Sequence, residues 1–299
     1  MTNTVSTQRS AVTRLGIFVA VLVVIAAAGF GLGWVVNDRD TSNSRTQMGA
    51  DGHSGDHAAS SQVATAGAIS GFGIAQQGYR IVAESTTFTP GVQSEFRFQI
   101  RDRNNRPVAD FPMVQEKRLH LVVVRRDLSG YQHLHPQRVD DTWRVPLTLP
   151  AAGSWRAVAD FVVEKGDKQV PLKLGVDLNA PGDYQPRMLP DPSLEAHVDD
   201  LTVRLGGDPK VGKQNQLQFT VLRDGQSVAS LERYLGSYGH LVVLRDGDLG
   251  YVHAHSENQL KDGAIAFTFA APSSGRYRAF FDFQLGGQVR TAEFTLNVQ

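Results

Sequence analysis

Residues 117–136 read KRLHLVVVRRDLSGYQHLHP, and residues 237–256 read SYGHLVVLRDGDLGYVHAHS. The two stretches lie 120 positions apart and are identical at nine of twenty positions. In each stretch a valine-rich run is followed by turn-forming residues and a second short run that starts with tyrosine, a pattern that predicts a β-hairpin. The sequence therefore predicts one structural unit that occurs twice.

Both hairpins contain histidines in the pattern His-x12-His-x-His: His120, His133 and His135 in the first, and His240, His253 and His255 in the second. Folding the first hairpin about its midpoint places His120 opposite His135, and His133 opposite Val122. Because strand side chains alternate with period two, His133 and His135 share a face about 6.6 Å apart, with His120 about 5 Å across from His135. Three imidazoles are predicted to converge, and the same arithmetic predicts a second trio.

Clustered imidazoles without cysteine favour a transition metal held by nitrogen. The chain has no cysteine, which excludes disulfides and thiolate metal sites. Protonated imidazoles would repel one another, whereas a bound cation uses their lone pairs. All-nitrogen sites suit copper or zinc, and the Irving–Williams order puts copper first. Structural hydrogen-bonding clusters around Tyr131 and Tyr251 are the main alternative, and pH sensing or catalysis is a further one.

A carboxylate occupies the same position in both copies of a later strand. Residues 153–161 (GSWRAVADF) parallel residues 275–283 (GRYRAFFDF), which aligns Asp160 with Asp282. Each could be a fourth metal ligand or an acceptor that fixes an imidazole tautomer. The alternative is a salt bridge to a neighbouring strand, with Arg125 and Arg245 as the candidate partners.

The rest of the chain has the texture of an all-β protein. Short alternating or β-rich runs are separated by turn residues, seven of them in each of two stretches of roughly 100 residues, and no amphipathic helix is evident. We expect two tandem immunoglobulin-like β-sandwich domains at 76–178 and 197–299. Between them, residues 179–196 contain four prolines and are expected to form a stiff linker.

The N-terminal residues indicate export. Residues 15–36 are uncharged and follow Arg9 and Arg14, which predicts a transmembrane helix with residues 1–14 in the cytoplasm. Residues 37–75 are rich in glycine, serine and alanine and are expected to be a flexible tether. A signal peptide cleaved near residues 26–28 is the alternative, and both interpretations place the domains outside the cytoplasm.

The segment LHLVVVRRDLSGYQHLHP resembles exported bacterial proteins. Its HLHP-type motif is similar to actinobacterial secreted or membrane-anchored proteins described as heavy-metal-binding, and the layout resembles immunoglobulin-like or cupredoxin-like metal-handling proteins of bacterial envelopes. The likeness covers most of residues 76–299. It implies a metal-binding role in the cell envelope and supplies no catalytic residues.

We therefore expect a membrane-anchored extracytoplasmic protein that buffers copper or zinc, or passes the ion to a partner such as a transporter. Thirty basic and thirty acidic residues, with no strongly basic run, exclude nucleic acid as a partner. Two alternatives from other classes stay open. One is a non-enzymatic adhesion or scaffold protein with structural histidines, and the other is a zinc hydrolase with three histidine ligands. No esterase, metalloprotease or phosphate-binding motif supports an enzyme.

Overall fold

The computed structural model of the chain describes residues 70–228, 230–252 and 254–299. The predicted anchor at 15–36, the cytoplasmic segment before it and His253 lie outside the described residues. No helix that could cross a membrane is found among the residues that are described. These residues belong to one compact unit.

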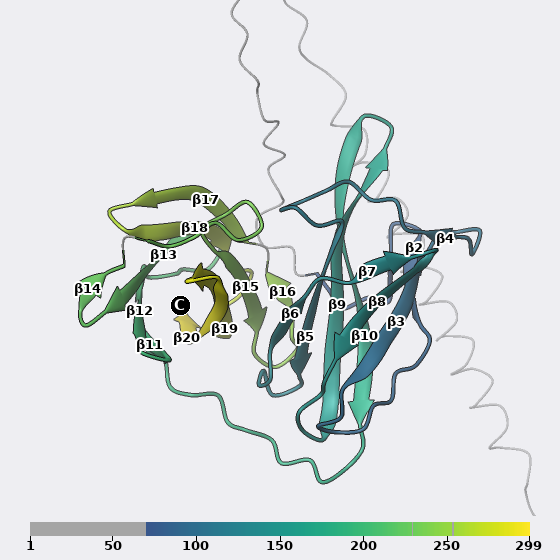
Figure 1. The fold of residues 1–299 in the computed structure, drawn as a ribbon, viewed down its shortest axis with the longest axis horizontal. Helices are drawn as coiled ribbons and strands as arrows, with labels where there is room; N and C mark the ends of the chain where they lie inside the picture. The colour runs from purple at the N-terminus through teal and green to yellow at the C-terminus, as the bar shows by residue number, and fades with distance from the viewer. Residues whose placement is uncertain (1–69, 229, 253) are drawn as a thin grey trace, which may run out of the picture. The chain divides into compact units, whose positions relative to one another are not determined.

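The first domain consists of two antiparallel sheets (Figure 1). The first sheet has the order β1-β2-β3-β8-β7 with β4 paired to β3, and its strands are β1 (Ala75–Gln76), β2 (Tyr79–Ala83), β3 (Ser94–Arg101), β4 (Pro107–Val108), β7 (Gln137–Val139) and β8 (Thr142–Leu147). The second sheet has the order β10-β9-β5-β6, and its strands are β5 (Leu119–Arg125), β6 (Gln132–Leu134), β9 (Gly153–Lys165) and β10 (Lys168–Ala180).

The second domain repeats this plan after residues 181–194, which form no strand. Its first sheet has the order β11-β12-β13-β18-β17 with β14 paired to β13, and its strands are β11 (Glu195–Val198), β12 (Leu201–Gly206), β13 (Gln214–Arg223), β14 (Gln226–Ser227), β17 (Ala254–Lys261) and β18 (Ala264–Ala270). Its second sheet has the order β16-β15-β19-β20, and its strands are β15 (His240–Arg245), β16 (Tyr251–Val252), β19 (Gly275–Leu285) and β20 (Gln288–Val298).

The strand order in both domains is that of an immunoglobulin-like sandwich. Strands β2, β3, β8 and β7 correspond to A, B, E and D, and strands β10, β9, β5 and β6 correspond to G, F, C and C′. The prediction of an all-β protein with two repeated sandwich domains is thus confirmed for the described residues.

The core of each domain follows from the alternation of side chains along its strands. In β3, Phe96, Phe98 and Ile100 are fully buried, whereas Glu95, just before them, and Arg97, between the two phenylalanines, are exposed. This is the half-buried pattern of a sheet with one wet face.

Strand β5 differs because all seven of its residues are buried. Leu121 and Val123 pack into the core of the first domain. Val122 and Val124 point to the opposite face and belong to a separate apolar cluster. A strand in which both faces are buried must be covered on both sides.

The second cover is the other domain. The cluster draws its buried members from both domains: Val122, Val124, Leu128, Val158, Val242, Leu244, Leu249, Tyr251 and Phe280. Within it the ring of Tyr131 stacks on Phe280, with centroids 4.0 Å apart and planes within 5°. The four-stranded sheets therefore share an apolar interface, which brings the histidines of the first domain close to residues of the second.

The turn that precedes the second strand of the histidine hairpin depends on a glycine. Gly130 has φ 68°, and a Cβ atom there would lie 2.5 Å from the buried ring of Trp155. We expect Gly130→Ala to lower the free energy of unfolding by about 1–2 kcal/mol, because it adds a clash to the strain of a positive φ. Gly91→Ala is the matched control for urea unfolding, since Gly91 has φ 73° and no heavy atom within 4 Å of such a Cβ. Equal losses in both variants would contradict the clash.

Candidate metal centre

The β5–β6 hairpin brings the first three histidines together. Leu121 pairs with Leu134 and Val122 with His133, which is the predicted register. The ring centroids are 5.1 Å apart for His120 and His135, 5.3 Å for His120 and His133, and 4.9 Å for His133 and His135. One ligand atom from each ring can be chosen so that all three atoms lie within 4.8 Å of one another.

His120 is held by a turn of the backbone. It is 8% exposed on β5, and its Nε2 lies 3.0 Å from the carbonyl oxygen of Val114. Because a carbonyl only accepts, Nε2 carries the proton and Nδ1 keeps its lone pair. The carbonyl belongs to a tight turn closed by Val114 and Lys117, in which Gln115 and Glu116 have φ values of 49° and 59°. Positive φ at two non-glycine residues is costly, and such strain is concentrated at functional sites.

His133 is oriented by a carboxylate of the other domain. Its Nδ1 lies 2.9 Å from Oδ2 of Asp282 on β19, a side chain that is almost fully buried. Asp282 also accepts from the hydroxyl groups of Tyr131 at 3.1 Å and Thr291 at 2.6 Å. A proton on Nδ1 for the carboxylate leaves the lone pair of His133 on Nε2. A carboxylate behind a ligating histidine in this way is the common second contact of metal sites.

Two lone pairs consequently face each other. Nδ1 of His120 and Nε2 of His133 are 3.2 Å apart. Two nitrogens bound at about 2.0–2.1 Å to one tetrahedral ion would be about 3.3 Å apart. Two acceptors at this separation need a shared cation, either a metal ion or a proton.

His135 offers a third nitrogen. Its Nδ1 lies 3.4 Å from the hydroxyl group of Tyr234, another residue of the second domain. Its Nε2 is buried and has no hydrogen-bond partner among the described residues. A buried imidazole nitrogen without a partner is costly unless something binds it.

The surroundings of His120 and His135 keep these two rings neutral. Burial, and then the nearby His133, lowers the pKa of His120 to about 4. Burial, followed by the charges of His133 and His120, lowers the pKa of His135 to about 3. Both rings are therefore uncharged at neutral pH, with one proton each, and an uncharged imidazole is the form that binds metal.

The second trio is placed differently as far as it is described. His240 is 4% exposed, and its Nε2 donates to the carbonyl oxygen of Tyr234 at 2.8 Å, as His120 does to Val114. His255, however, lies in β17, where it pairs with Thr268 in the other sheet and is exposed. The register of β15 and β16 is the predicted one, but the chain crosses between sheets after Val252. With His253 outside the described residues, a second metal site stays a prediction.

The two repeated aspartates have different partners. Asp282 contacts an imidazole, as expected of an acceptor that fixes a tautomer, although the ring belongs to the other domain. Asp160 instead forms an ion pair with Lys173 on β10, with 3.1 Å between nitrogen and oxygen. The suggested partners Arg125 and Arg245 are wrong, since each pairs with an aspartate of its own hairpin turn. Asp160 belongs to no described cluster of candidate ligands.

Sequence reasoning missed Val114, Tyr234 and Thr291. Val114 and Tyr234 hold His120 and His240 through backbone carbonyl oxygens, which every residue type has, so residue identity does not reveal this contact. The one available signal is that positions 114 and 234 are 120 residues apart, which is the spacing of the repeat.

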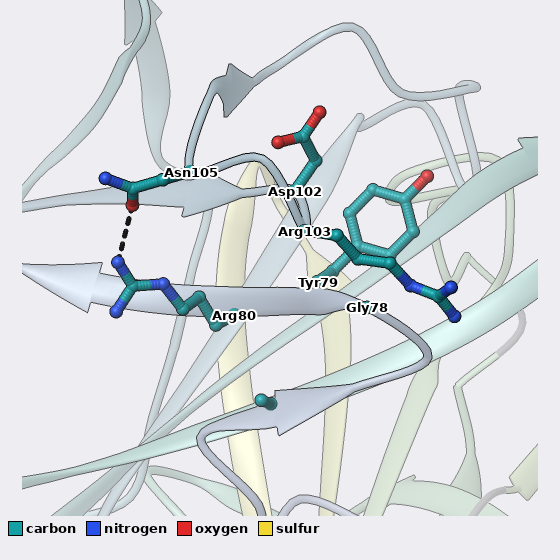
Figure 2. A pocket seen from close by; sticks show the side chains of 7 residues that line it. Gly78, Tyr79, Arg80, Asp102, Arg103 and Asn105 are labelled. Atoms are coloured by element: carbon teal, nitrogen blue, oxygen red, sulfur yellow. Dashed lines mark hydrogen bonds between the residues drawn. The ribbon is translucent and has the colours of Figure 1, made fainter.

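A separate hollow lies beside β2 in the first domain (Figure 2). It is lined by Ala75, Gly78, Tyr79, Arg80, Asp102, Arg103 and Asn105. Arg80 donates to Asn105 at 2.5 Å, and Asp102 pairs with Arg106 at 2.8 Å. No histidine lines it.

Fold and site together define a tandem immunoglobulin-like sandwich protein with a histidine cluster at the contact between its domains. The model of a family described as a domain of unknown function, DUF8832, matches residues 74–177 and again residues 196–299. The chain belongs to this family, with two copies of its domain. No curated protein matches the sequence.

Solved structures show distant likenesses only. The Escherichia coli adhesin FdeC is 14% identical, with 78% of this chain and 66% of that chain covered and a TM-score of 0.24. The Yersinia pseudotuberculosis adhesin InvE is 12% identical over 76% of this chain and 61% of that one, with a TM-score of 0.22. Salmonella alpha-2-macroglobulin is 16% identical over 79% and 16%, with a TM-score of 0.26. Likeness at this level supports no inference about function.

Proposed function

We propose that the chain is a membrane-anchored extracytoplasmic protein that binds a transition-metal ion through His120, His133 and His135. Copper is the first candidate and zinc the second, because the ligands are all imidazole nitrogens. The protein would buffer the ion or pass it to a partner such as a transporter. Its immunoglobulin-like domains and envelope location would serve this role.

The arrangement of ring nitrogens supports metal binding best. Each ring has one nitrogen beside a group outside the trio: a carbonyl oxygen for His120, a carboxylate for His133 and a phenol hydroxyl for His135. The second nitrogens of His120 and His133 face each other, and Nε2 of His135 has no hydrogen-bond partner in the described residues. A proton between His120 and His133 would satisfy those two rings but not His135.

Asp282 adds an electrostatic argument. Its carboxylate is almost fully buried and forms no ion pair with a lysine or arginine in the described part of the chain. A buried charge without an opposite charge is costly. A cation held by His133 would provide the compensating charge through the ring that Asp282 contacts.

The same geometry disfavours the hydrolase alternative. A metal-bound water needs a nearby general base, and the repeated aspartates were its candidates. Asp282 accepts from Tyr131, His133 and Thr291, and Asp160 is neutralised by Lys173. The adhesion or scaffold alternative makes a different prediction, which is a melting temperature that does not respond to metal.

Titration of the full-length protein in detergent with Cu(II) and Zn(II) tests the proposal. We expect tight uptake of at least one ion per chain, with stabilisation by about 2.7 kcal/mol when the free ion is at 100 times its Kd. The double variant His133→Gln, His135→Gln is expected to lose both the uptake and the thermal shift. His197→Gln is the control, since His197 lies on β11 and contacts Thr202 outside the cluster. Equal weak uptake by all three proteins would refute metal binding.

A further inference from the structure

The hollow beside β2 carries more positive charge than its own carboxylates balance. Arg80 and Arg103 line it, and Arg101 and Arg106 donate to two of its other lining residues. Asp102 is the one carboxylate among the residues that line the hollow. Four guanidinium groups therefore accompany a single carboxylate.

That carboxylate is matched by one of the four arginines. The guanidinium of Arg106 lies 3.0 Å and 2.8 Å, through Nε and Nη2, from Oδ2 of Asp102. Oδ1 accepts from the backbone N–H groups of Asn104 and Arg106, which closes the turn between β3 and β4. The charge of Asp102 is thus balanced by Arg106 and does not neutralise the other three.

Arg80 and Arg101 form a like-charged pair across two strands. They lie directly opposite each other in the register of β2 and β3, an arrangement that destabilises a sheet. Both donate to one neutral acceptor, Oδ1 of Asn105, at 2.5 Å from Arg80 and 3.2 Å from Arg101 (Figure 2). The other acceptor of Arg101, Oε1 of Gln99 at 3.0 Å, is also uncharged. Two guanidinium groups therefore converge where an anion would bind more favourably than an amide.

Arg103 adds a third guanidinium group to the hollow. Its side chain lies over Gly78, and a Cβ atom at that position would occupy the same space. The side chain of Arg103 has no hydrogen bond or ion pair with any described residue. Lys165 increases the positive charge further, since its ammonium lies 5.7 Å from the centroid of the Tyr79 ring in the lining.

The second domain lacks this excess of charge. Its equivalent strands, β12 and β13, place Leu201 opposite Arg223, so one arginine stands where the first domain has two. Arg223 forms an ion pair with Asp200 at 2.8 Å. Residues 224–227 read DGQS, and this turn contains no arginine. The excess is therefore not required by the fold, and a local conflict of this kind is typical of a functional site.

We propose that the hollow beside β2 binds a phosphate group through Arg80, Arg101 and Arg103. Planar guanidinium groups donate in pairs to phosphate oxygens, and a phosphate offers enough acceptors for three of them. The bound anion would replace Asn105 as the shared acceptor and remove the repulsion between Arg80 and Arg101. Two sources supply such a group, the free ion and the headgroup of an anionic phospholipid. The site is independent of the metal-binding function proposed above.

Titration of the metal-free full-length protein in an uncharged detergent tests the proposal. We expect calorimetry to show one inorganic phosphate bound per chain, and the melting temperature to exceed that in chloride at equal ionic strength. Arg80→Gln and Arg103→Gln should each raise the Kd for phosphate at least tenfold. Arg223→Gln, at the position equivalent to Arg101, is the matched control and should leave the Kd unchanged.

Short-chain lipids identify the source of the phosphate. Dihexanoyl phosphatidylglycerol has a net negative charge at its phosphate, whereas dihexanoyl phosphatidylcholine has the same phosphate beside a compensating cation. Tighter binding of phosphatidylglycerol than of inorganic phosphate, weakened tenfold by Arg103→Gln, would support a lipid headgroup as the ligand. Tighter binding of inorganic phosphate, with the same response to Arg103→Gln, would support the free ion.

Two results would overturn the site. One is a wild type that responds to phosphate and phosphatidylglycerol no more than to chloride and phosphatidylcholine, and the other is undiminished binding by folded Arg80→Gln and Arg103→Gln proteins. Melts without phosphate check folding, and Arg103→Gln decides the matter if Arg80→Gln does not fold, because it removes no contact between described side chains. The His133→Gln, His135→Gln protein should bind phosphate as the wild type does, so that failure of metal binding and failure of this site are distinguishable.

Discussion

Replacing Phe280 by alanine is expected to lower the free energy of unfolding by about 3–5 kcal/mol. Phe280 is fully buried in the cluster between the domains and stacks on Tyr131 at 4.0 Å. Truncation would remove this stack and leave a cavity between two sheets that cannot easily close. Urea unfolding of the full-length protein measures the loss.

The same variant is expected to weaken metal binding although Phe280 contacts no ligand atom in the described residues. Phe280 lies two residues before Asp282 on β19, so loosening this interface displaces the carboxylate that orients His133. Tyr131→Phe is the matched control, because it keeps the ring stack and removes only the hydroxyl that donates to Asp282. Tyr131→Phe is expected to lower the free energy of unfolding by only about 0.5–1.5 kcal/mol. If Phe280→Ala and Tyr131→Phe lowered the free energy of unfolding equally, the hydrogen bond, and not the packing, would be what joins the domains.

Which parts of this arrangement the sequence could predict depends on how local they are. The hairpin register follows from the period of two and from a short turn, and the pairing of Val122 with His133 confirms it. The duplicated domains follow from the repeat. Both features are encoded within a few tens of residues, where alternation and turn residues determine the outcome.

Contacts between the domains join residues that are far apart in the sequence, and local patterns do not encode them. Nothing in the spacing of His133 and Asp282 indicates that they meet, because they belong to different copies of the repeat. The uninterrupted apolar run of β5 was the available signal, since it requires cover on both faces. It indicates that a second surface packs there, but not which residues that surface contributes.

The difference between the trios shows the limit of reasoning by repeat. His135 lies in the connection between β6 and β7, whereas its counterpart His255 is already the second residue of β17. The chain thus passes from one sheet to the other at slightly different points in the two copies. As a result His255 is exposed and His135 is partly buried, although both have the same sequence spacing. The identity of the partner strand is a tertiary property that the pattern does not contain.

Acid is expected to destabilise the metal-free protein steeply. Burial lowers the pKa of His120 to about 4 and of His135 to about 3 in the folded state, compared with about 6.5 in an unfolded chain. Between these values the unfolded state binds more protons than the folded state, so the free energy of unfolding falls as the pH falls. Their contribution is fully present above pH 6.5 and is lost progressively down to about pH 3–4.

The size of this effect makes it measurable. Each ring contributes a slope of about 1.4 kcal/mol per pH unit once the pH is well below 6.5, and two rings together about 2.7. Urea unfolding in chelator at pH 7.5, 6.0, 5.0 and 4.5 gives the slope. His135→Gln is expected to reduce it by about half, because one of the two buried imidazoles is gone, whereas His197→Gln on the exposed β11 strand should leave it unchanged. An unchanged slope in the His135→Gln protein would mean that the acid sensitivity arises elsewhere, and that His135 is not held neutral by burial in the cluster.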